Sequence, residues 1–477
     1  MAAAAKSPPR RLNAATLQAH SVLSDPSQGA GFAAATGPFL LGRVCRATGW
    51  IALFLLAACA PAPVSRSALP PAGPLLQFAV SPAHPPSRPN GQVAQDFLDL
   101  EFHLESGQTL PALSRFDGPI TVALTGQIPP TAAAETARLV ARLQAEAGLD
   151  LHITDAPANI TIQFAPASAL QRLDRSSACF VAPNVSSLSE YRAGFGSDAL
   201  EWQNIRQRQR LAIFIPTDTS PQEQRDCLHE ELAQALGPLN DLYRLPDSVF
   251  NDDNFLSTLT GFDMLMLRLH YAPELANGMT EPQVAARLPA LLHRLNPSGE
   301  VPGQWDHPGT PRDWIQAVQT ALGPDSPQSA RRPAAERMLS IAQTEGWQDA
   351  RLGLAYFALG RLEDPNNPYA AEQDFLAAAS IFARLPDGGA RLAHALLQLA
   401  AINLALNDPE QVIRLTNQAL PLAETAQNAA LIANLMRLQA EALTLTGQPE
   451  NAAALRLDSL PAARYGFGSA ATAMAGP

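Results

Sequence analysis

The sequence has a single lysine, only four cysteines, few charged residues and one short apolar run. Charged residues make up 16% of its 477 residues, and 33 Lys and Arg against 44 Asp and Glu give a formal net charge of −11. This acidic balance excludes a nucleic-acid-binding protein, because no broad cationic face is available for phosphates. The scarcity of apolar runs excludes a multi-pass membrane protein. The 47% hydrophobic content instead predicts two or three ordinary domains with cores.

The apolar run lies at residues 50–58 (WIALFLLAA), after two arginines and directly before Cys59. It is too short to span a bilayer as a helix but suits the apolar region of a signal peptide. Residues 56–59 (LAAC) resemble a bacterial lipobox, in which the cysteine thiol receives a diacylglyceryl group. We therefore predict a signal peptide over residues 1–58, with a true start downstream of Met1, and a lipid anchor at Cys59. An ordinary secretory signal is the alternative.

The predicted location follows from this lipobox resemblance. Ala60 occupies the position where an aspartate would favour retention in the inner membrane, so the resemblance implies an outer-membrane lipoprotein facing the periplasm. With Cys45 in the removed segment and Cys59 acylated, Cys179 and Cys227 remain. In an oxidising compartment they most simply form one disulfide. Two free thiols, one of them catalytic, are the alternative.

Composition divides the rest of the chain into five segments. Nine prolines between residues 60 and 92 indicate a stiff, hydrated spacer. Mixed strand and helix patterns follow, and then an alanine- and leucine-rich stretch with helical periodicity and no strand signal. The predicted segments are a lipid-anchored Pro-rich linker (59–92), an α+β domain (93–282), a connecting segment (283–327), helical repeats (328–465) and a flexible tail (466–477).

The α+β domain contains one helix with explicit end signals. Ser220 is the predicted N-cap, Pro221 the first helical residue and Glu223 the reciprocal capping partner. Gly237 lies where a left-handed residue commonly ends a helix. Other predicted helices are 93–104 and 131–147, and the predicted strands are 120–124, 151–154, 159–164 and 211–216.

The C-terminal helices carry a repeat. Residues 406–410 (LNDPE) recur as 446–450 (TGQPE), 40 residues later, and an earlier copy is centred on Gly360. Helix pairs with this period resemble tetratricopeptide repeats, whose stacked hairpins present a concave surface to peptides or partner proteins. A plain helical bundle packed against the first domain is the alternative.

The capped helix carries a recognisable spacing at residues 230–241 (EELAQALGPLND). Metzincin-type zinc peptidases place H-E-x-x-H-x-x-G-x-x-H-D at such a helix, because residues four apart share one face and the glycine turns the chain toward a third ligand. Here the spacing is kept and the histidines are not. Glu230, Gln234 and Asn240 occupy the three histidine positions, Glu231 the catalytic-base position, Gly237 the turn and Asp241 the flanking position.

A longer resemblance covers about residues 93–279. Ser248 and Phe250 fall where a metzincin has the serine-x-methionine turn beneath its metal. The chain is similar to the bacterial domain-of-unknown-function family 2927, found in predicted lipoproteins, which implies a degenerate zincin-like domain and no established reaction. The resemblance rests on residues 230–241, 248–253, 259–260, 269–273 and 463–468, together with Asp263.

These replacements bear on metal binding. Catalytic zinc takes three strong ligands and leaves a position open for water, whereas one carboxylate and two amides bind it weakly. Hard oxygen donors favour calcium or no ion, so we expect that these residues bind no zinc. Weak calcium binding is the alternative, both at this helix and at residues 251–253. The helix then uses its polar residues as a hydrogen-bonded cluster, with Arg244 or Arg268 as the cationic partner.

Three functions follow as hypotheses. The first is a non-catalytic, metallopeptidase-like envelope lipoprotein whose cleft and helical repeats bind a protein or peptide. The second is a periplasmic hydrolase that uses Glu231 as general base with atypical or no metal ligands. The third assigns function to the repeats alone. In each, the partners are the membrane, through Cys59, and a protein or peptide, with no nucleic acid.

Overall fold

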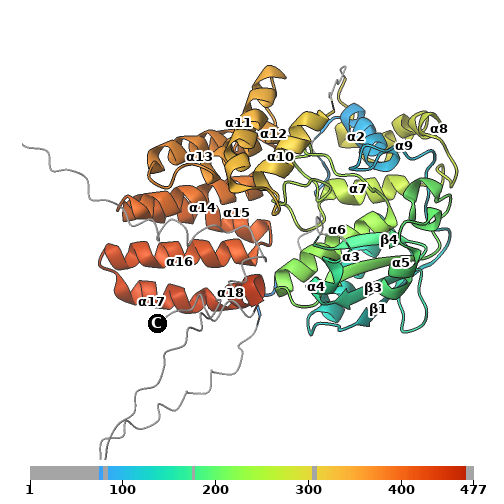
Figure 1. The fold of residues 1–477 in the computed structure, drawn as a ribbon, viewed down its shortest axis with the longest axis horizontal. Coiled ribbons are helices and arrows are strands. Elements are labelled where there is room, and N and C mark those ends of the chain that lie inside the picture. Colours follow the sequence, from blue (N-terminus) through green and yellow to red (C-terminus); the bar gives the residue numbers. More distant parts are fainter. Residues whose placement is uncertain (1–74, 79–83, 87, 174–177, 303–308, 469–477) are drawn as a thin grey trace, which may run out of the picture. The chain divides into compact units, whose positions relative to one another are not determined.

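The computed structural model describes residues 75–78, 84–86, 88–173, 178–302 and 309–468. A five-stranded mixed sheet with its helices comes first along the chain, and a region of helices alone follows (Figure 1). This confirms an α+β domain followed by an all-helical region. The predicted signal peptide, the Cys59 anchor and most of the Pro-rich linker lie outside the described residues. No helix in the described ranges is long and apolar enough to cross a membrane.

The sheet has the strand order β2-β1-β3-β5-β4. Four strands run parallel, and the edge strand β4 pairs antiparallel with β5, with Ala182 opposite Ala212. The sequence predicted the parallel strands and missed β4, a four-residue segment that ends in proline and shows no alternation. The strands are β1 (Ile120–Gly126), β2 (Leu151–Ile153), β3 (Ile160–Ala165), β4 (Phe180–Pro183) and β5 (Leu211–Pro216).

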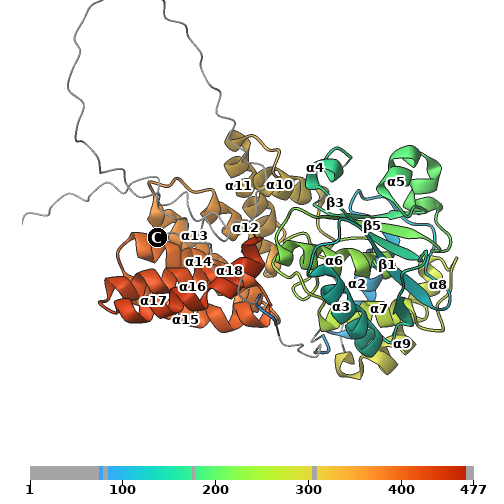
Figure 2. The ribbon, with the colours of Figure 1, turned by 90° about the horizontal axis from the view of Figure 1, so that it is seen from below.

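Strand β5, which lies between β3 and the edge strand β4, is buried on both faces of the sheet. Ile213 and Ile215 join the main core, where α3 (Ala132–Ala147) and α6 (Pro221–Leu236) cover one face. Phe214 belongs to a smaller core under α4 (Ala167–Leu170) and α5 (Leu188–Gly194) on the other face (Figure 2). Each such side chain contributes roughly 1.5–3 kcal/mol through burial. The packing of Ile213 and Ile215 therefore holds α6 against its face of the sheet.

Both ends of α6 are capped by side chains. At the start, Ser220 and Glu223 form the predicted capping box, with Pro221 at the first position. At the other end, the buried Arg208 guanidinium donates to the carbonyls of Gln234, Ala235 and Gly237. A buried arginine thus satisfies the carbonyls that the helix leaves unpaired.

The prediction of a left-handed Gly237 is wrong. Its φ is −150° and its ψ −105°, because the Arg208 cap replaces the left-handed turn. A glycine is needed here for close packing instead. A Cβ at this position would lie 3.1 Å from Leu267 Cδ2 and 3.5 Å from His270 Cγ, on α7 (Gly261–His270).

The predicted disulfide between Cys179 and Cys227 is confirmed. It joins the residue before β4 to the middle of α6, so the edge strand is covalently tied to the helix beside it. On the far side of α6, α7 packs against α3 and α9, and α2 packs against α8 and α9. These helices are α2 (Asn90–Phe102), α8 (Glu281–Ala285) and α9 (Leu288–Leu295).

The helical region is a series of antiparallel neighbours with a 40-residue period. Helices α12, α14 and α16 begin at residues 350, 389 and 429, and their partners α13, α15 and α17 begin with prolines at 368, 409 and 449. The two predicted repeat turns lie between α14 and α15 and between α16 and α17. Its helices are α10 (Arg312–Leu322), α11 (Gln328–Thr344), α12 (Ala350–Arg361), α13 (Pro368–Phe382), α14 (Gly389–Ala405), α15 (Pro409–Thr425), α16 (Ala429–Leu445), α17 (Pro449–Asp458) and α18 (Leu460–Phe467).

Glycine has different uses in these hairpins. Asn407 and Gly447 occupy equivalent turn positions and both have positive φ, 62° and 79°. Gly360, the predicted centre of the earlier copy, instead lies inside α12, and a Cβ there would be 3.0 Å from the Phe375 ring. The earlier turn therefore comes later, just before Pro368.

A loop of the sheet domain is fastened to the helical region. Arg391 on α14 is fully buried and pairs with Asp253 at 2.6 Å, and it also donates to the carbonyls of Leu245 and Pro246. Nearby, the Phe255 ring packs against aromatic rings of α12, α13 and α14. This loop, residues 245–255, also supplies part of the candidate site.

Candidate functional site

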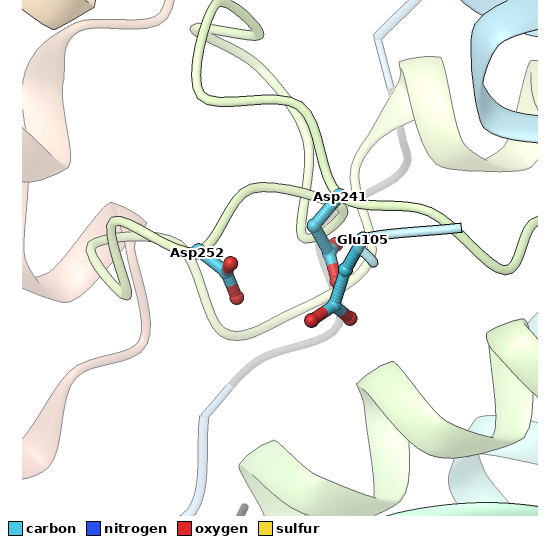
Figure 3. A group of neighbouring side chains, drawn as sticks. All are labelled: Glu105, Asp241 and Asp252. Atoms are coloured by element: carbon cyan, nitrogen blue, oxygen red, sulfur yellow. The ribbon is translucent and has the colours of Figure 1, made fainter. Parts of the chain in front are cut away.

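Five carboxylates gather around the end of α6 and the chain that follows it. Glu230 and Glu231 belong to its last two turns, and Asp241 follows five residues after the helix ends. Asp252 comes from the loop of residues 245–255, and Glu105 from the turn after α2. Figure 3 shows the side chains of Glu105, Asp241 and Asp252 directed toward one another.

The three acids in Figure 3, which we call the carboxylate triad (Glu105, Asp241 and Asp252), are close enough to share one ligand. One carboxylate oxygen from each lies within 4.8 Å of the other two. Glu105 is exposed, Asp252 is half-buried, and Asp241 is only 9% exposed. The triad therefore has its open side at Glu105 and its buried side at Asp241.

Few neutral hydrogen-bond donors among the described residues contact the carboxylates of the triad. Gln234 Nε2 donates to Asp241 Oδ2 at 3.3 Å, and the Tyr243 hydroxyl donates to Asp252. The other oxygen of Asp241, Oδ1, is buried without a hydrogen-bond partner, and so is Glu231 Oε2. Buried carboxylate oxygens without donors are costly, which marks this region as unusual for a folded protein.

Burial and mutual repulsion raise the pKa values of these acids. Desolvation, and then the charges of Asp252 and Glu105, raise the pKa of Glu230 to about 8. Desolvation followed by Glu105 raises the pKa of Asp252 to about 7. The pKa values of Glu231 and Asp241 are well above their usual range for the same reasons. Several of these groups hence carry protons at neutral pH.

The predicted cationic partners lie elsewhere. Arg244 pairs with Asp96 and Asp99, each at 2.7 Å, and does not reach the triad. Arg268 is half-buried, its Nε lacks a partner, and it forms no ion pair with these acids. The expectation that Arg244 or Arg268 neutralises the cluster is therefore wrong, because Arg244 already neutralises the carboxylates of α2.

The three predicted ligand positions do not share one hydrogen-bond network. Glu230 is half-buried and acts on the triad through its charge, and Gln234 binds Asp241 directly. Asn240 turns away and donates from Nδ2 to the carbonyl of Asp99 at 2.9 Å. The structure thus places Glu230 and Gln234 beside Asp241 of the triad. Asn240 instead holds the chain against α2.

Other predicted residues have local structural roles. Ser248 Oγ donates to Asp263 Oδ1 at 2.5 Å and accepts from the Phe250 amide at 3.0 Å, so the two residues form a buried turn at the start of α7. His229 Nδ1 accepts from the Leu259 amide. These contacts connect the loop after α6 to the core.

Sequence reasoning missed Glu105. It lies in an exposed turn held by Arg312, whose guanidinium donates to the carbonyls of Glu105 and Ser106. No motif surrounds it, and it precedes Asp241 by more than a hundred residues. Only the pairing of distant loops brings it to the triad, so no local signal in the sequence indicates its role.

A second candidate site lies in the helical region. A groove of about 470 Å³ is lined by α12, α13, α14, α16 and α17, with Phe375 and Ile402 among its apolar residues. Arg361 stands on its wall, half-buried, and burial followed by the charge of Arg331 lowers its pKa. Within the described residues the Arg361 guanidinium has no ion pair or hydrogen bond.

Comparison with known families covers the sheet domain. The model of a family described as "Protein of unknown function (DUF2927)" matches residues 90–290. This confirms the resemblance to the domain-of-unknown-function family over this part of the chain. A search of the curated proteins finds no match. The matched range contains the whole carboxylate triad and ends before the helical groove.

Proposed function

Because residues 90–290 make this chain a member of the DUF2927 family, whose reaction is unknown, we propose a function from its own side chains: it is a binding protein. In this proposal the sheet domain is a zincin-like domain without peptidase activity. The helical region is a tetratricopeptide-like array that binds an extended peptide. Acylated Cys59 anchors both in the bacterial cell envelope, at the outer membrane facing the periplasm.

The site chemistry supports a non-catalytic sheet domain. None of the three ligand positions carries an imidazole or a thiolate, the usual strong ligands of zinc in this arrangement. Burial, followed by the charge of Glu230, raises the pKa of the Glu231 carboxyl well above its usual range, which favours its protonated form. A protonated acid cannot accept a proton from water, which disfavours the alternative of a hydrolase with Glu231 as general base.

The fold supports the two finer assignments. A mixed sheet packs on the helix that carries the metzincin-like spacing, as the zincin resemblance implies. The hairpins of the helical region begin at 350, 389 and 429, close to the period of helical repeats that stack into a shared core. Prolines at the first position of each second helix make these units alike.

The groove in the helical region is the observation that carries the proposal. Its apolar floor, formed by Phe375, Ile402 and Leu445 among others, suits one or two apolar side chains of a peptide. The unpartnered guanidinium of Arg361 on its wall suits a carboxylate, either a side chain or a peptide C-terminus. We therefore expect an extended peptide with apolar residues next to an acidic group.

The test is selection of peptides from a random display library on the full-length protein. We expect enrichment of sequences that combine apolar residues with a carboxylate. Ala405→Trp fills the groove from α14, where Ala405 lines it without joining the core, and should abolish binding. Arg361→Gln should remove the preference for the carboxylate while apolar binding remains.

Ala454→Trp is the matched control, because Ala454 is exposed on α17 and does not line the groove. It should bind the selected peptides as the wild type does. A library that yields no enriched peptides, or peptides that bind Ala405→Trp as well as Ala454→Trp, would refute the groove as the binding site.

A further inference from the structure

Several interior acids of this protein are paired with arginine, whereas the fully buried Asp263 accepts hydrogen bonds from Ser248 and Thr260. Asp247 pairs with Arg88 at 2.8 Å, and Asp253 pairs with Arg391 at 2.6 Å. Asp226 likewise pairs with its neighbour Arg225 at 2.6 Å. Since burying an unpaired charge is expensive, this pairing is what makes so many interior carboxylates tolerable.

The carboxylate triad has no such arginine in the part of the chain that the structure describes. Within the described residues, none of Glu105, Asp241 and Asp252 forms an ion pair, and neither do Glu230 and Glu231 beside them. Asp241 is more than nine-tenths buried, points toward Glu105 and Asp252, and keeps Oδ1 without a partner (Figure 3). A bound cation would supply the positive charge that the described chain does not place beside these acids.

We propose that Glu105, Asp241 and Asp252 bind a divalent cation, and that Ca²⁺ is the ion best suited to them. The site goes beyond the proposed peptide-binding function, because it lies in the sheet domain and uses none of the groove residues.

The spacing of the oxygens fits this ion. Calcium ligands lie at about 2.3–2.6 Å, so two oxygens bound to one ion are at most about 5 Å apart. The triad oxygens, within 4.8 Å of one another, fall inside that limit. Glu105 is exposed and leaves the ion a path from solvent, and water can fill the remaining positions on that side.

The donor types select among metals. All three ligands are carboxylates, and Glu230 adds a fourth acid whose charge acts on Asp241. Hard oxygen donors on separate loops favour Ca²⁺, which accepts irregular geometry, over Zn²⁺, which prefers imidazole and thiolate. His229 and His270 are held in the core by the Leu259 amide and by Glu101, and they do not face the triad.

The test is calorimetric titration of Ca²⁺ into the full-length protein after removal of metal with a chelator. We expect one ion per chain and a higher unfolding temperature in millimolar Ca²⁺. Terbium offers a second readout, because Tyr243 touches Asp252 and packs on Trp314, so exciting these rings should sensitise Tb³⁺ emission that Ca²⁺ then quenches by displacement.

Asp252→Asn and Asp241→Asn should each weaken Ca²⁺ binding by about tenfold or more, since each removes one charged ligand. Both variants should unfold at a higher temperature than the wild type in chelator, because the substitution relieves repulsion, and this shows that they are folded. Asp155→Asn, at an exposed position of the sheet domain, is the matched control and should bind Ca²⁺ normally.

Three outcomes would overturn the proposal. The first is absence of heat and of any thermal shift with Ca²⁺. The second is equal binding by Asp252→Asn and Asp155→Asn, which would place the ion elsewhere. The third is preferential binding of Zn²⁺ over Ca²⁺. Peptide binding at the groove is measured separately with Ala405→Trp, so failure of one proposal leaves the other standing.

Discussion

The sheet domain and the helical region bury different kinds of side chain. The sheet domain encloses acids and arginines such as Asp96, Arg208, Arg244 and Asp263, each almost inaccessible to solvent. The helical region packs mainly alanine, leucine and phenylalanine, and its largest buried charges are Arg351 and Arg391. Interior charge requires specific partners, whereas apolar packing requires only volume and shape. The first region therefore depends on specific charge pairs, and the second on fitted apolar surfaces.

Replacing Arg391, which links the two regions, should have the largest effect on the free energy of unfolding. Arg391 carries a charge from the helical region into the sheet domain, and Arg391→Met leaves Asp253 buried without its cation. We expect a loss of about 3–5 kcal/mol in the free energy of unfolding, measured with denaturant. Arg351→Met is the matched control, because its partner Asp349 is partly exposed and can be solvated. Equal losses in the two variants would contradict this account.

The disulfide offers the next largest effect and is confined to the sheet domain. Replacing both Cys179 and Cys227 with serine removes the crosslink between the β4 edge and α6, and should cost about 2–4 kcal/mol. Hydrogen exchange should accelerate in β4 and α6 and stay unchanged in α14 to α16. Wild type treated with reductant should match the variant. Faster exchange throughout the helical region would show that the two regions unfold together.

The smallest expected effect over any single pH unit is a pH dependence of the sheet domain. Burial raises the pKa of Glu230 from 4.5 to about 8, so its stabilising contribution is complete at low pH and is lost as pH rises toward 8. Glu230→Gln should therefore gain stability relative to the wild type by up to about 1.4 kcal/mol per pH unit, from about pH 5 to about pH 8, in chelator. Glu424→Gln, at an exposed position of α15, should show no such trend.

The parts of the fold that local physics determines could be predicted from sequence. The capping box at Ser220 and the parallel strands follow from residue patterns that span a few positions. The repeat turns are equally local, since Asn407 and Gly447 precede a proline that starts the next helix. The end of α6 was not predictable in this way, because Arg208, a residue from a distant loop, caps it.

The candidate site was predictable only in part. Asp241 and its neighbours on α6 were identified from their spacing, because a helix fixes which residues share a face. Glu105 and Asp252 join them from loops whose positions depend on tertiary packing, such as the contact of Arg391 with Asp253. The sequence therefore indicated the helix that carries the site and, separately, Asp252 as a weak calcium ligand, but it contained no signal for Glu105 or for the meeting of these acids.

Guanidinium groups supply almost every buried cation in this fold, from the Arg208 cap to the Arg391 clamp, and no lysine occurs between residues 75 and 468. Reagents that acylate primary amines thus find no side-chain target in this whole span. Arg456→Lys would introduce a solitary reactive amine at the rim of the groove, so that one fluorophore could report its occupancy without competing labels.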